Sequence, residues 1–180
     1  VDASCAVAEG GDLMCWGEDS SGQSSEAPDG SFTAVSMGRD HACAIDVAGE
    51  IECWGSDDYG LTTDMPSGSF VSVDSANEHS CAASTEGEVT CWGYDNDDVV
   101  TAAPVGTWSI VRTGFNRACA IDTTSELTCW GSEGWDLSSD TPSGPVLDVD
   151  TGYSVSCALD SAGSVICWGN DKSGAYTDAP

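Results

Sequence analysis

Short segments in which apolar and polar residues alternate recur along this chain, and the clearest covers residues 41–55. Alternation with a period of two predicts β-strands, and no segment keeps the periodicity of a helix. If Cys43 lies opposite Cys53, residues 47–49 form a three-residue hairpin loop. Such a loop favours glycine in the left-handed position that ends the turn, and Gly49 occupies it.

The hairpin has apolar side chains on both faces. Strand geometry separates them into two sets, Cys43, Ile45, Ile51 and Cys53 on one face and Ala44 and Trp54 on the other. We therefore expect neighbouring hairpins to cover both faces. Four hairpins carry the loop glycine, at Gly11, Gly49, Gly87 and Gly163. Ser125 takes its place in the fourth, which we expect to be strained or differently turned.

Each of the first four hairpins is followed by a further strand pattern, in residues 31–35, 69–73, 107–111 and 145–149. A polar stretch lies between each hairpin and this further strand, as in residues 56–64. We interpret it as a turn plus a short outer strand. Each unit then holds about four short strands, which is the size of one propeller blade. The sequence therefore predicts an all-β fold built of blades.

The whole pattern repeats every 38 residues without a gap. The predicted single domain, 1–180, divides into repeats 1–38, 39–76, 77–114, 115–152 and 153–180. Each repeat has two cysteines, a Trp-Gly pair after the second cysteine, and a proline, from Pro28 to Pro180. We therefore predict a five-bladed β-propeller with one disulfide inside each blade. Residues that recur in every repeat belong to the scaffold, so specific function is expected where the repeats differ.

The ten cysteines are expected to pair across the five hairpins. Directly opposed residues of a tight antiparallel hairpin lie close to disulfide distance. The predicted bridges are Cys5–Cys15, Cys43–Cys53, Cys81–Cys91, Cys119–Cys129 and Cys157–Cys167. Zinc is disfavoured, because there is no Cys-x-x-Cys pair and only two histidines, His41 and His79. Paired cysteines in this number indicate an oxidising compartment, so we expect a secreted, extracellular or cell-surface protein.

The net charge limits the classes of binding partner that we expect. The chain has 31 acidic and 4 basic residues, for a formal net charge of -27. Such a surface disfavours nucleic acid and anionic membranes and favours cationic partners, divalent ions or a salty medium. No apolar run is long enough to insert into a membrane. A start at Val1 rather than methionine indicates a processed mature end or the edge of an excised domain.

The recurring motif is His-Ser/Ala-Cys-Ala-Ile/Leu, then Gly-x-Ile/Val-x-Cys-Trp-Gly, then Asp-x-x-Gly and a proline. It resembles the repeat of the regulator of chromosome condensation family. It is most similar to the compact bacterial secreted branch, which includes the propeller-type β-lactamase inhibitor protein. The resemblance implies a β-propeller that binds through loops at one end. Eukaryotic members act on a small GTPase and on chromatin, and a disulfide-rich chain of this charge suits neither.

Candidate binding residues lie between the Trp-Gly pairs and the prolines. Exposed aromatic residues can stack on sugars or anchor a protein, and the candidates are Tyr59, Tyr94, Trp135 and Tyr176. Packing between blades is the equally weighted alternative. Carboxylates in the same loops could bind calcium, and the candidates are Asp57, Asp58, Asp95, Asp97 and Asp98. An acid that recurs at Asp19, Asp57, Asp95, Glu133 and Asp171 is expected instead to cap a turn.

No nucleophile motif, phosphate loop or cofactor fingerprint is present, so no catalytic residue and no cofactor are expected. The histidine column, His41 and His79, is expected to hydrogen-bond a neighbouring blade. We predict a secreted, non-enzymatic interaction module or structural building block for adhesion, protein binding or extracellular assembly. The alternative is a carbohydrate-binding propeller lectin.

Five hairpins are accompanied by only four copies of the additional strand, because the fifth repeat stops at Pro180. Three interpretations stay open. The chain is a five-bladed propeller with one thin blade, it is a fragment of a longer propeller, or a strand from another molecule fills the incomplete blade. The last would allow subunits to assemble head to tail.

Overall fold

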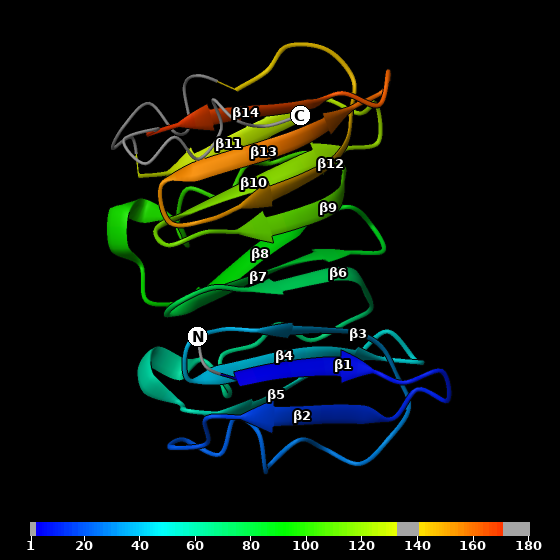
Figure 1. Ribbon diagram of the computed structural model, residues 1–180, viewed down its shortest axis with the longest axis vertical. Coiled ribbons are helices and arrows are strands. Elements are labelled where there is room, and N and C mark those ends of the chain that lie inside the picture. The colour runs from blue at the N-terminus through cyan, green and yellow to red at the C-terminus, as the bar shows by residue number, and fades with distance from the viewer. Residues whose placement is uncertain (1–2, 133–140, 171–180) are drawn as a thin grey trace.

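The computed structural model describes residues 3–132 and 141–170, and within these ranges its regular structure is almost entirely β-strand (Figure 1). The strands are β1 (Ala3–Val7), β2 (Leu13–Gly17), β3 (Phe32–Met37), β4 (His41–Asp46), β5 (Ile51–Gly55), β6 (Phe70–Ser75), β7 (His79–Ser84), β8 (Val89–Gly93), β9 (Trp108–Thr113), β10 (Arg117–Asp122), β11 (Leu127–Gly131), β12 (Val146–Thr151), β13 (Val155–Asp160) and β14 (Val165–Gly169). They form five separate antiparallel sheets, which are the five blades that the repeats predict.

Each complete blade combines two repeats. The order β3-β4-β5 joins the last strand of the first repeat to the hairpin of the second, and the next three sheets follow the same rule. Among the described strands, the first sheet contains only β1 and β2. The first blade is therefore the incomplete one in this part of the chain, because no described strand lies beside β1 as β3 lies beside β4.

The described blades contain at most three strands, so the expected fourth, outer strand is wrong. The stretch after Gly55 forms a short 3-10 turn, η1 (Asp58–Gly60), and η2 (Asn96–Asp98) follows β8 in the same way. Asp57 explains the difference, because its Oδ1 accepts the backbone N–H of Thr62 at 2.9 Å. Such local side-chain bonds offer the backbone an alternative to a β-ladder.

The predicted hairpin register is confirmed. Cys43 lies opposite Cys53, and Ile45 lies opposite Ile51. All five predicted disulfides form, and each has a Cα–Cα distance of 4.0 or 4.1 Å. Each disulfide closes a short loop and would stabilise its blade by roughly 2–3 kcal/mol in the chain-entropy model.

The fourth hairpin keeps the same turn without glycine. Gly49 has φ 89° and donates its N–H to Asp46 O at 3.1 Å. Ser125 has φ 70° and donates to Asp122 O at the same distance. The turn therefore keeps its shape and is strained, because the left-handed backbone conformation is energetically unfavourable for a residue with a Cβ.

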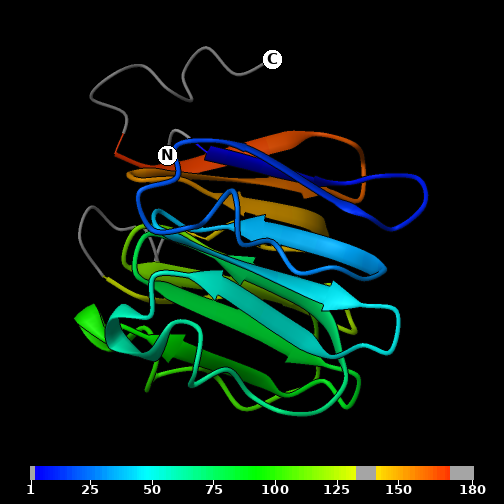
Figure 2. The same cartoon turned by 90° about the horizontal axis from the view of Figure 1, so that it is seen from below.

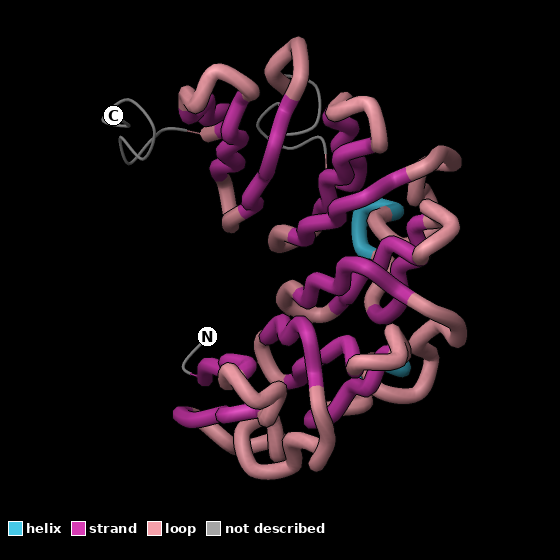
Figure 3. Tube along the Cα trace, turned by 90° about the vertical axis from the view of Figure 1, so that its right-hand side faces the viewer, coloured by secondary structure: helices cyan, strands magenta, loops and turns pink. Residues whose placement is uncertain are grey.

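Each internal blade is covered on both faces, as the two apolar sets predict. Cys43, Ile45 and Ile51 pack against the following blade, next to Trp92. Ala42, Ala44 and Trp54 pack against the preceding blade, next to its disulfide. The blades follow one another around an arc, with the first and last blades at its two ends (Figure 3). Extensive contacts between the described strands join only consecutive blades.

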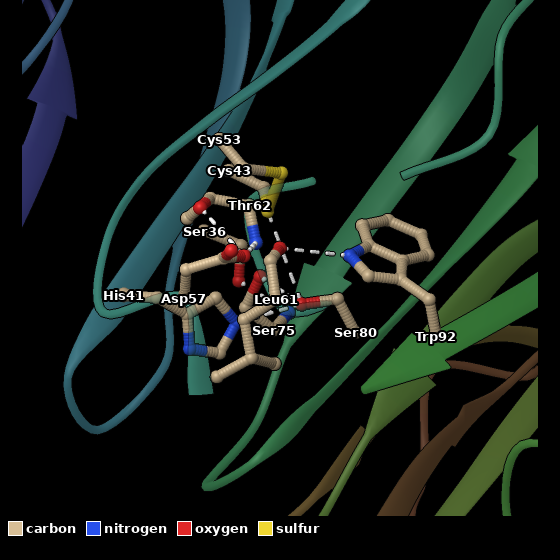
Figure 4. Close-up of a disulfide and its surroundings, with 10 residues drawn as sticks. All are labelled: Ser36, His41, Cys43, Cys53, Asp57, Leu61, Thr62, Ser75, Ser80 and Trp92. Carbon is tan, nitrogen blue, oxygen red and sulfur yellow. Dashed lines mark hydrogen bonds between the residues drawn. A yellow bond between two sulfur atoms is a disulfide. The ribbon is translucent and has the colours of Figure 1, made fainter. Parts of the chain in front are cut away.

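Buried polar side chains also connect neighbouring blades. His41 lies in β4, and its Nε2 is 2.8 Å from the Ser80 hydroxyl of the next blade (Figure 4). This confirms the expected contact for His41. Burial lowers the pKa of both His41 and His79 to about 4, so both rings are neutral near pH 7. Arg117 takes the equivalent place in β10, and its Nη2 donates to Gly152 O at 2.8 Å.

Candidate interaction surface at one end of the blades

The loops that carry the candidate residues gather at one end of the molecule. Antiparallel pairing places two sets of connections there, those that follow the Trp-Gly pairs and those that join β3 to β4, β6 to β7, β9 to β10 and β12 to β13. Both 3-10 turns lie at this end, which we call the loop end (Figures 1 and 2). The hairpin turns, which include Ser125, lie at the opposite end.

Two predicted aromatic residues meet at the loop end. Tyr59 lies in η1 and Tyr94 directly follows β8, and their ring centroids are 4.6 Å apart. The two residues come from consecutive blades, and both are exposed, 55% for Tyr59 and 41% for Tyr94. The backbone of Tyr59 is left-handed, with φ 60°, so the chain leaves this residue in a different direction from that in a regular helical turn.

A second aromatic pair, Phe115 and Tyr153, was not predicted. These residues lie in the β9–β10 and β12–β13 loops, and their ring centroids are also 4.6 Å apart. Both are exposed. The sequence does carry a signal, because both open a repeat where the other repeats have Val1, Arg39 and Asn77. Aromatic residues at one position of consecutive repeats indicate contact between blades.

The two pairs belong to one surface. Asn116, next to Phe115, donates from Nδ2 to Asp97 Oδ2 at 3.2 Å, which connects the β9–β10 loop to η2. Tyr94 lies just before η2. We call these four aromatic residues, Tyr59, Tyr94, Phe115 and Tyr153, the aromatic band. The other two predicted aromatic residues, Trp135 and Tyr176, lie outside the described residues.

Carboxylates surround the band, and their main role at the described positions is to cap turns. Oδ1 of Asp57 accepts both the N–H and the hydroxyl of Thr62, each at 2.9 Å. The backbone hydrogen bond from Thr62 is the main reason that the pKa of Asp57 is lowered. Asp95 accepts Val100 N at 2.8 Å in the same manner. The turn-capping expectation thus holds for these two residues.

Calcium stays a prediction. The candidates Asp58, Asp97 and Asp98 lie in the two 3-10 turns, close to the capping Asp57 and Asp95. Among residues 3–132 and 141–170, no cluster of three or more His, Cys, Asp or Glu side chains is arranged to hold a metal ion. Calorimetric titration with calcium after chelator treatment tests the prediction, and an absence of heat would remove it.

The loop end is acidic, and Arg39 forms ion pairs there. The Arg39 guanidinium contacts Asp40 at 2.6 Å and Glu78 at 3.1 Å, which joins two consecutive blades at the surface. With a formal net charge of -27, the field around this end attracts cationic groups. In the part of the chain that the structure describes, no helix is long and apolar enough to cross a membrane.

The blades, their disulfides and the loops collected at one end define a β-propeller-type repeat protein. The described blades form an arc whose two ends lie apart (Figure 3). The repeat itself can be named. The profile of the Regulator of chromosome condensation (RCC1) repeat matches residues 32–61, and the same motif recurs through all five blades. Residues 32–61 thus match an RCC1-type repeat, and the chain as a whole is similar in fold to RCC1-type repeat propellers.

Solved structures share this fold. The ectodomain of the Physcomitrella patens receptor kinase CR4 is 24% identical with a TM-score of 0.79, and the match covers 93% of this chain and 49% of that one. The CRINKLY WD40 ectodomain of the Arabidopsis thaliana receptor kinase ACR4 is 24% identical with a TM-score of 0.73, covering 93% and 65%. Yeast RCC1 (Prp20), solved bound to Kap60, is 15% identical with a TM-score of 0.63, covering 77% and 43%.

These likenesses show the fold, because the identities are low. The chain spans between about two fifths and two thirds of the length of these solved chains. A search of curated proteins gave no match. The neighbours include two receptor-kinase ectodomains and a propeller solved in complex with another protein.

Proposed function

We propose that this chain is a non-enzymatic, extracellular interaction module that binds a protein partner through the aromatic band. The observation that carries the proposal is the pairing of exposed rings across blades, Tyr59 with Tyr94 and Phe115 with Tyr153. Large aromatic side chains dominate the energetics of protein interfaces. Exposed pairs on consecutive blades are therefore suited to bury area against a partner.

The scaffold supports this role because it is rigid behind the band. Each described blade has its hairpin closed by a disulfide, such as Cys43–Cys53 behind Tyr59 and Cys81–Cys91 behind Tyr94. A pre-ordered surface loses less conformational entropy when it binds. Five disulfides also favour an oxidising, extracellular location, which receptor ectodomains of the same fold share.

Charge selects the class of partner. The acidic loop end favours a protein with a basic surface, whose approach it would accelerate at low ionic strength. The expected association rate falls as salt is raised, since exposed charges are screened. Dissociation is expected to depend mainly on the aromatic contacts rather than on the rim charges.

Surface plasmon resonance against a panel of extracellular protein domains, basic and acidic, tests the proposal. Tyr94→Ala removes one ring from the band and is expected to weaken binding at least about 30-fold, as for an interface hot spot. Val105→Ser is the matched control, because Val105 is a fully exposed apolar residue at the opposite end. Binding to basic domains that Tyr94→Ala leaves unchanged would count against the band.

A carbohydrate-binding function is the second candidate. The planes of the Tyr59 and Tyr94 rings are tilted by 32°, and the Asp57 carboxylate and the Thr62 hydroxyl flank η1, which carries Tyr59. Stacking rings beside hydrogen-bonding groups suits a sugar. A glycan array separates the two functions, since specific glycan binding lost in Tyr94→Ala would favour the lectin and displace the protein partner.

Extracellular assembly by strand addition is a further element of the proposal. The edge of β1 that corresponds to the paired edge of β4 has no described strand beside it. An open edge can accept an extended segment. A labelled synthetic peptide that copies residues 31–38 is expected to bind, with anisotropy as the readout and a scrambled peptide as control. Equal binding of both peptides would refute strand addition.

A further inference from the structure

A network of polar side chains is buried between the second blade (β3, β4 and β5) and the third blade (β6, β7 and β8). The hydroxyl of Ser80 lies 2.8 Å from Nε2 of His41 and 2.9 Å from the hydroxyl of Ser75 (Figure 4). Oγ of Ser36 accepts the backbone N–H of Ser75 at 3.0 Å. The two side chains that the second blade contributes, those of Ser36 and His41, are uncharged near pH 7.

The same four positions hold two arginines and two hydroxyl residues between the fourth blade (β9, β10 and β11) and the fifth blade (β12, β13 and β14). They are Arg112, Arg117, Thr151 and Ser156, which lie two repeats after Ser36, His41, Ser75 and Ser80. Thr151 and Ser156 are directly opposed in the paired strands β12 and β13. The fourth blade therefore carries two cations at the places where the second blade has uncharged groups.

Among the described residues, only one of these two arginines has a carboxylate partner. Arg112 is partly exposed and pairs with Asp148 at 3.4 Å. Arg117 is 1% exposed, and its described hydrogen bonds go to backbone carbonyl oxygens, with Nη2 donating to Gly152 at 2.8 Å and to Val155 at 3.2 Å. Burial lowers the pKa of Arg117 to about 10, so the guanidinium is still charged at pH 7. A buried charge that lacks an opposite charge is unfavourable.

Three polar atoms at this contact are buried and have no hydrogen-bond partner among the described residues. They are Nε of Arg117, Oγ1 of Thr151 and Oγ of Ser156, in residues that are at most 7% exposed. The three side chains lie near one another, because Nη2 of Arg117 bonds the carbonyl oxygens of Gly152, which follows Thr151, and of Val155, which precedes Ser156. Each of the three atoms carries a hydrogen that it can donate.

The arginine also leaves room that the histidine ring takes up in the second blade. A Cβ added to Gly38 would lie 2.3 Å from Cε1 of His41. At the equivalent Gly114, an added Cβ would lie 3.3 Å from the nearest atoms of Arg117, Cγ and Nε. The guanidinium turns toward the carbonyl oxygens of the β12–β13 loop instead, so part of the place that the imidazole ring fills is open to another small group.

We infer that a small monovalent anion of the halide class, chloride in an extracellular medium, binds between the fourth and fifth blades. Nε of Arg117 and the hydroxyls of Thr151 and Ser156 donate hydrogen bonds to it. A water molecule could also accept these bonds, but only an anion balances the buried charge of Arg117. The neighbouring carboxylates of Asp148 and Asp150 are exposed, so solvent and salt screen their repulsion. The site does not involve the aromatic band.

Thermal unfolding of the disulfide-intact chain tests the inference. Sodium chloride replaces sodium gluconate stepwise at a fixed ionic strength of about 0.15 M, so that screening of the net charge of -27 stays constant. An anion that binds only the folded chain stabilises it, and the Tm is expected to rise by roughly 3–5 °C for each tenfold increase of chloride above the dissociation constant. Bromide should act as chloride does.

Two variants with the same change of residue separate this site from general salt effects. Arg117→His restores the residue of the second repeat, gives Ser156 the kind of partner that Ser80 has, and should remove the chloride dependence of the Tm. Arg39→His changes an exposed arginine and should keep that dependence. The inference is overturned if the Tm of Arg117→His follows chloride as the wild type does, or if Arg39→His loses the dependence.

A direct measurement covers the case in which Arg117→His does not fold. Crystals of the wild type grown in sodium bromide should show an anomalous scattering peak within hydrogen-bond distance of Nε of Arg117 and of the Ser156 hydroxyl. A water molecule at this place without anomalous signal, or a side chain that fills it, would overturn the inference. Tyr94→Ala should keep the wild-type chloride dependence, so failure of the aromatic band and failure of this site are distinguishable.

Discussion

Acidification should destabilise this protein through its buried histidines. His41 and His79 have pKa values lowered to about 4 by burial, against an ordinary value of 6.5. A histidine with a lowered folded pKa binds its proton first in the unfolded chain. Its contribution to stability is therefore fully present above pH 6.5 and is lost as the pH falls toward 4.

The magnitude follows from the two pKa values. Each pKa unit corresponds to about 1.4 kcal/mol, so a shift of about 2.5 units would cost roughly 3 kcal/mol per histidine at full loss. Between pH 7 and pH 4.5 we expect a loss of roughly 2–3 kcal/mol for each ring. Asp74 acts in the opposite direction, because burial raises its pKa and its protonation stabilises the folded state. Acidification also weakens the charge repulsion within the folded protein, and this too stabilises the folded state.

A variant separates these effects. His79→Val places in the third repeat the residue that the fifth repeat has at Val155. The free energy of unfolding is measured in urea with the disulfides intact, with tryptophan fluorescence as the signal. Between pH 7 and pH 4.5, the variant should lose roughly 2–3 kcal/mol less stability than the wild type. His41→Asn should behave similarly, and Val105→Ser should keep the wild-type dependence. A His79→Val profile parallel to the wild type would refute the reasoning.

Three further outcomes are expected for the scaffold. Ser125→Gly should stabilise the chain by about 0.5–1 kcal/mol, because relief of left-handed strain exceeds the added entropy of the unfolded state. Gly163→Ser should destabilise the chain by a similar amount, although the new Cβ would meet no atom within 4 Å. Thermal denaturation of the two variants measures both changes. Trp92→Phe should cost about 1–2 kcal/mol in chemical denaturation, because the carbonyl of Leu61 loses its buried donor. Asp95→Ala should cost about 1 kcal/mol and speed amide exchange at the η2 turn, whereas unchanged exchange would speak against the cap.

Much of the local structure can be predicted because its determinants are near in sequence. The hairpin register depends on the ten-residue cysteine spacing and on a loop that ends in the left-handed conformation, and both lie within one repeat. The outer strand was wrongly predicted because its polar residues match a strand end as well as a capped turn. Which of the two forms depends on whether Asp57 reaches Thr62, and a pattern of polarity does not report that.

The candidate surface depends more on the tertiary structure. The pairing of Tyr59 with Tyr94 joins residues 35 positions apart, and Phe115 with Tyr153 joins the first residues of two repeats. The first pair does not keep the repeat register, so only the paths of the η1 and η2 loops bring those rings together. The second pair keeps the register, and its meeting follows from the stacking of blades.

The amino-acid sequence by itself determined the repeat, the strands of each hairpin, the five disulfides and the covering of both faces of an internal blade. These features depend on residues within one or two repeats, where alternation and spacing describe the contacts directly. Only the tertiary structure decided which copies of a recurring residue are covered. Trp16 and Trp54 have the same neighbours in sequence, yet one is exposed and the other buried, because burial depends on the adjacent blade.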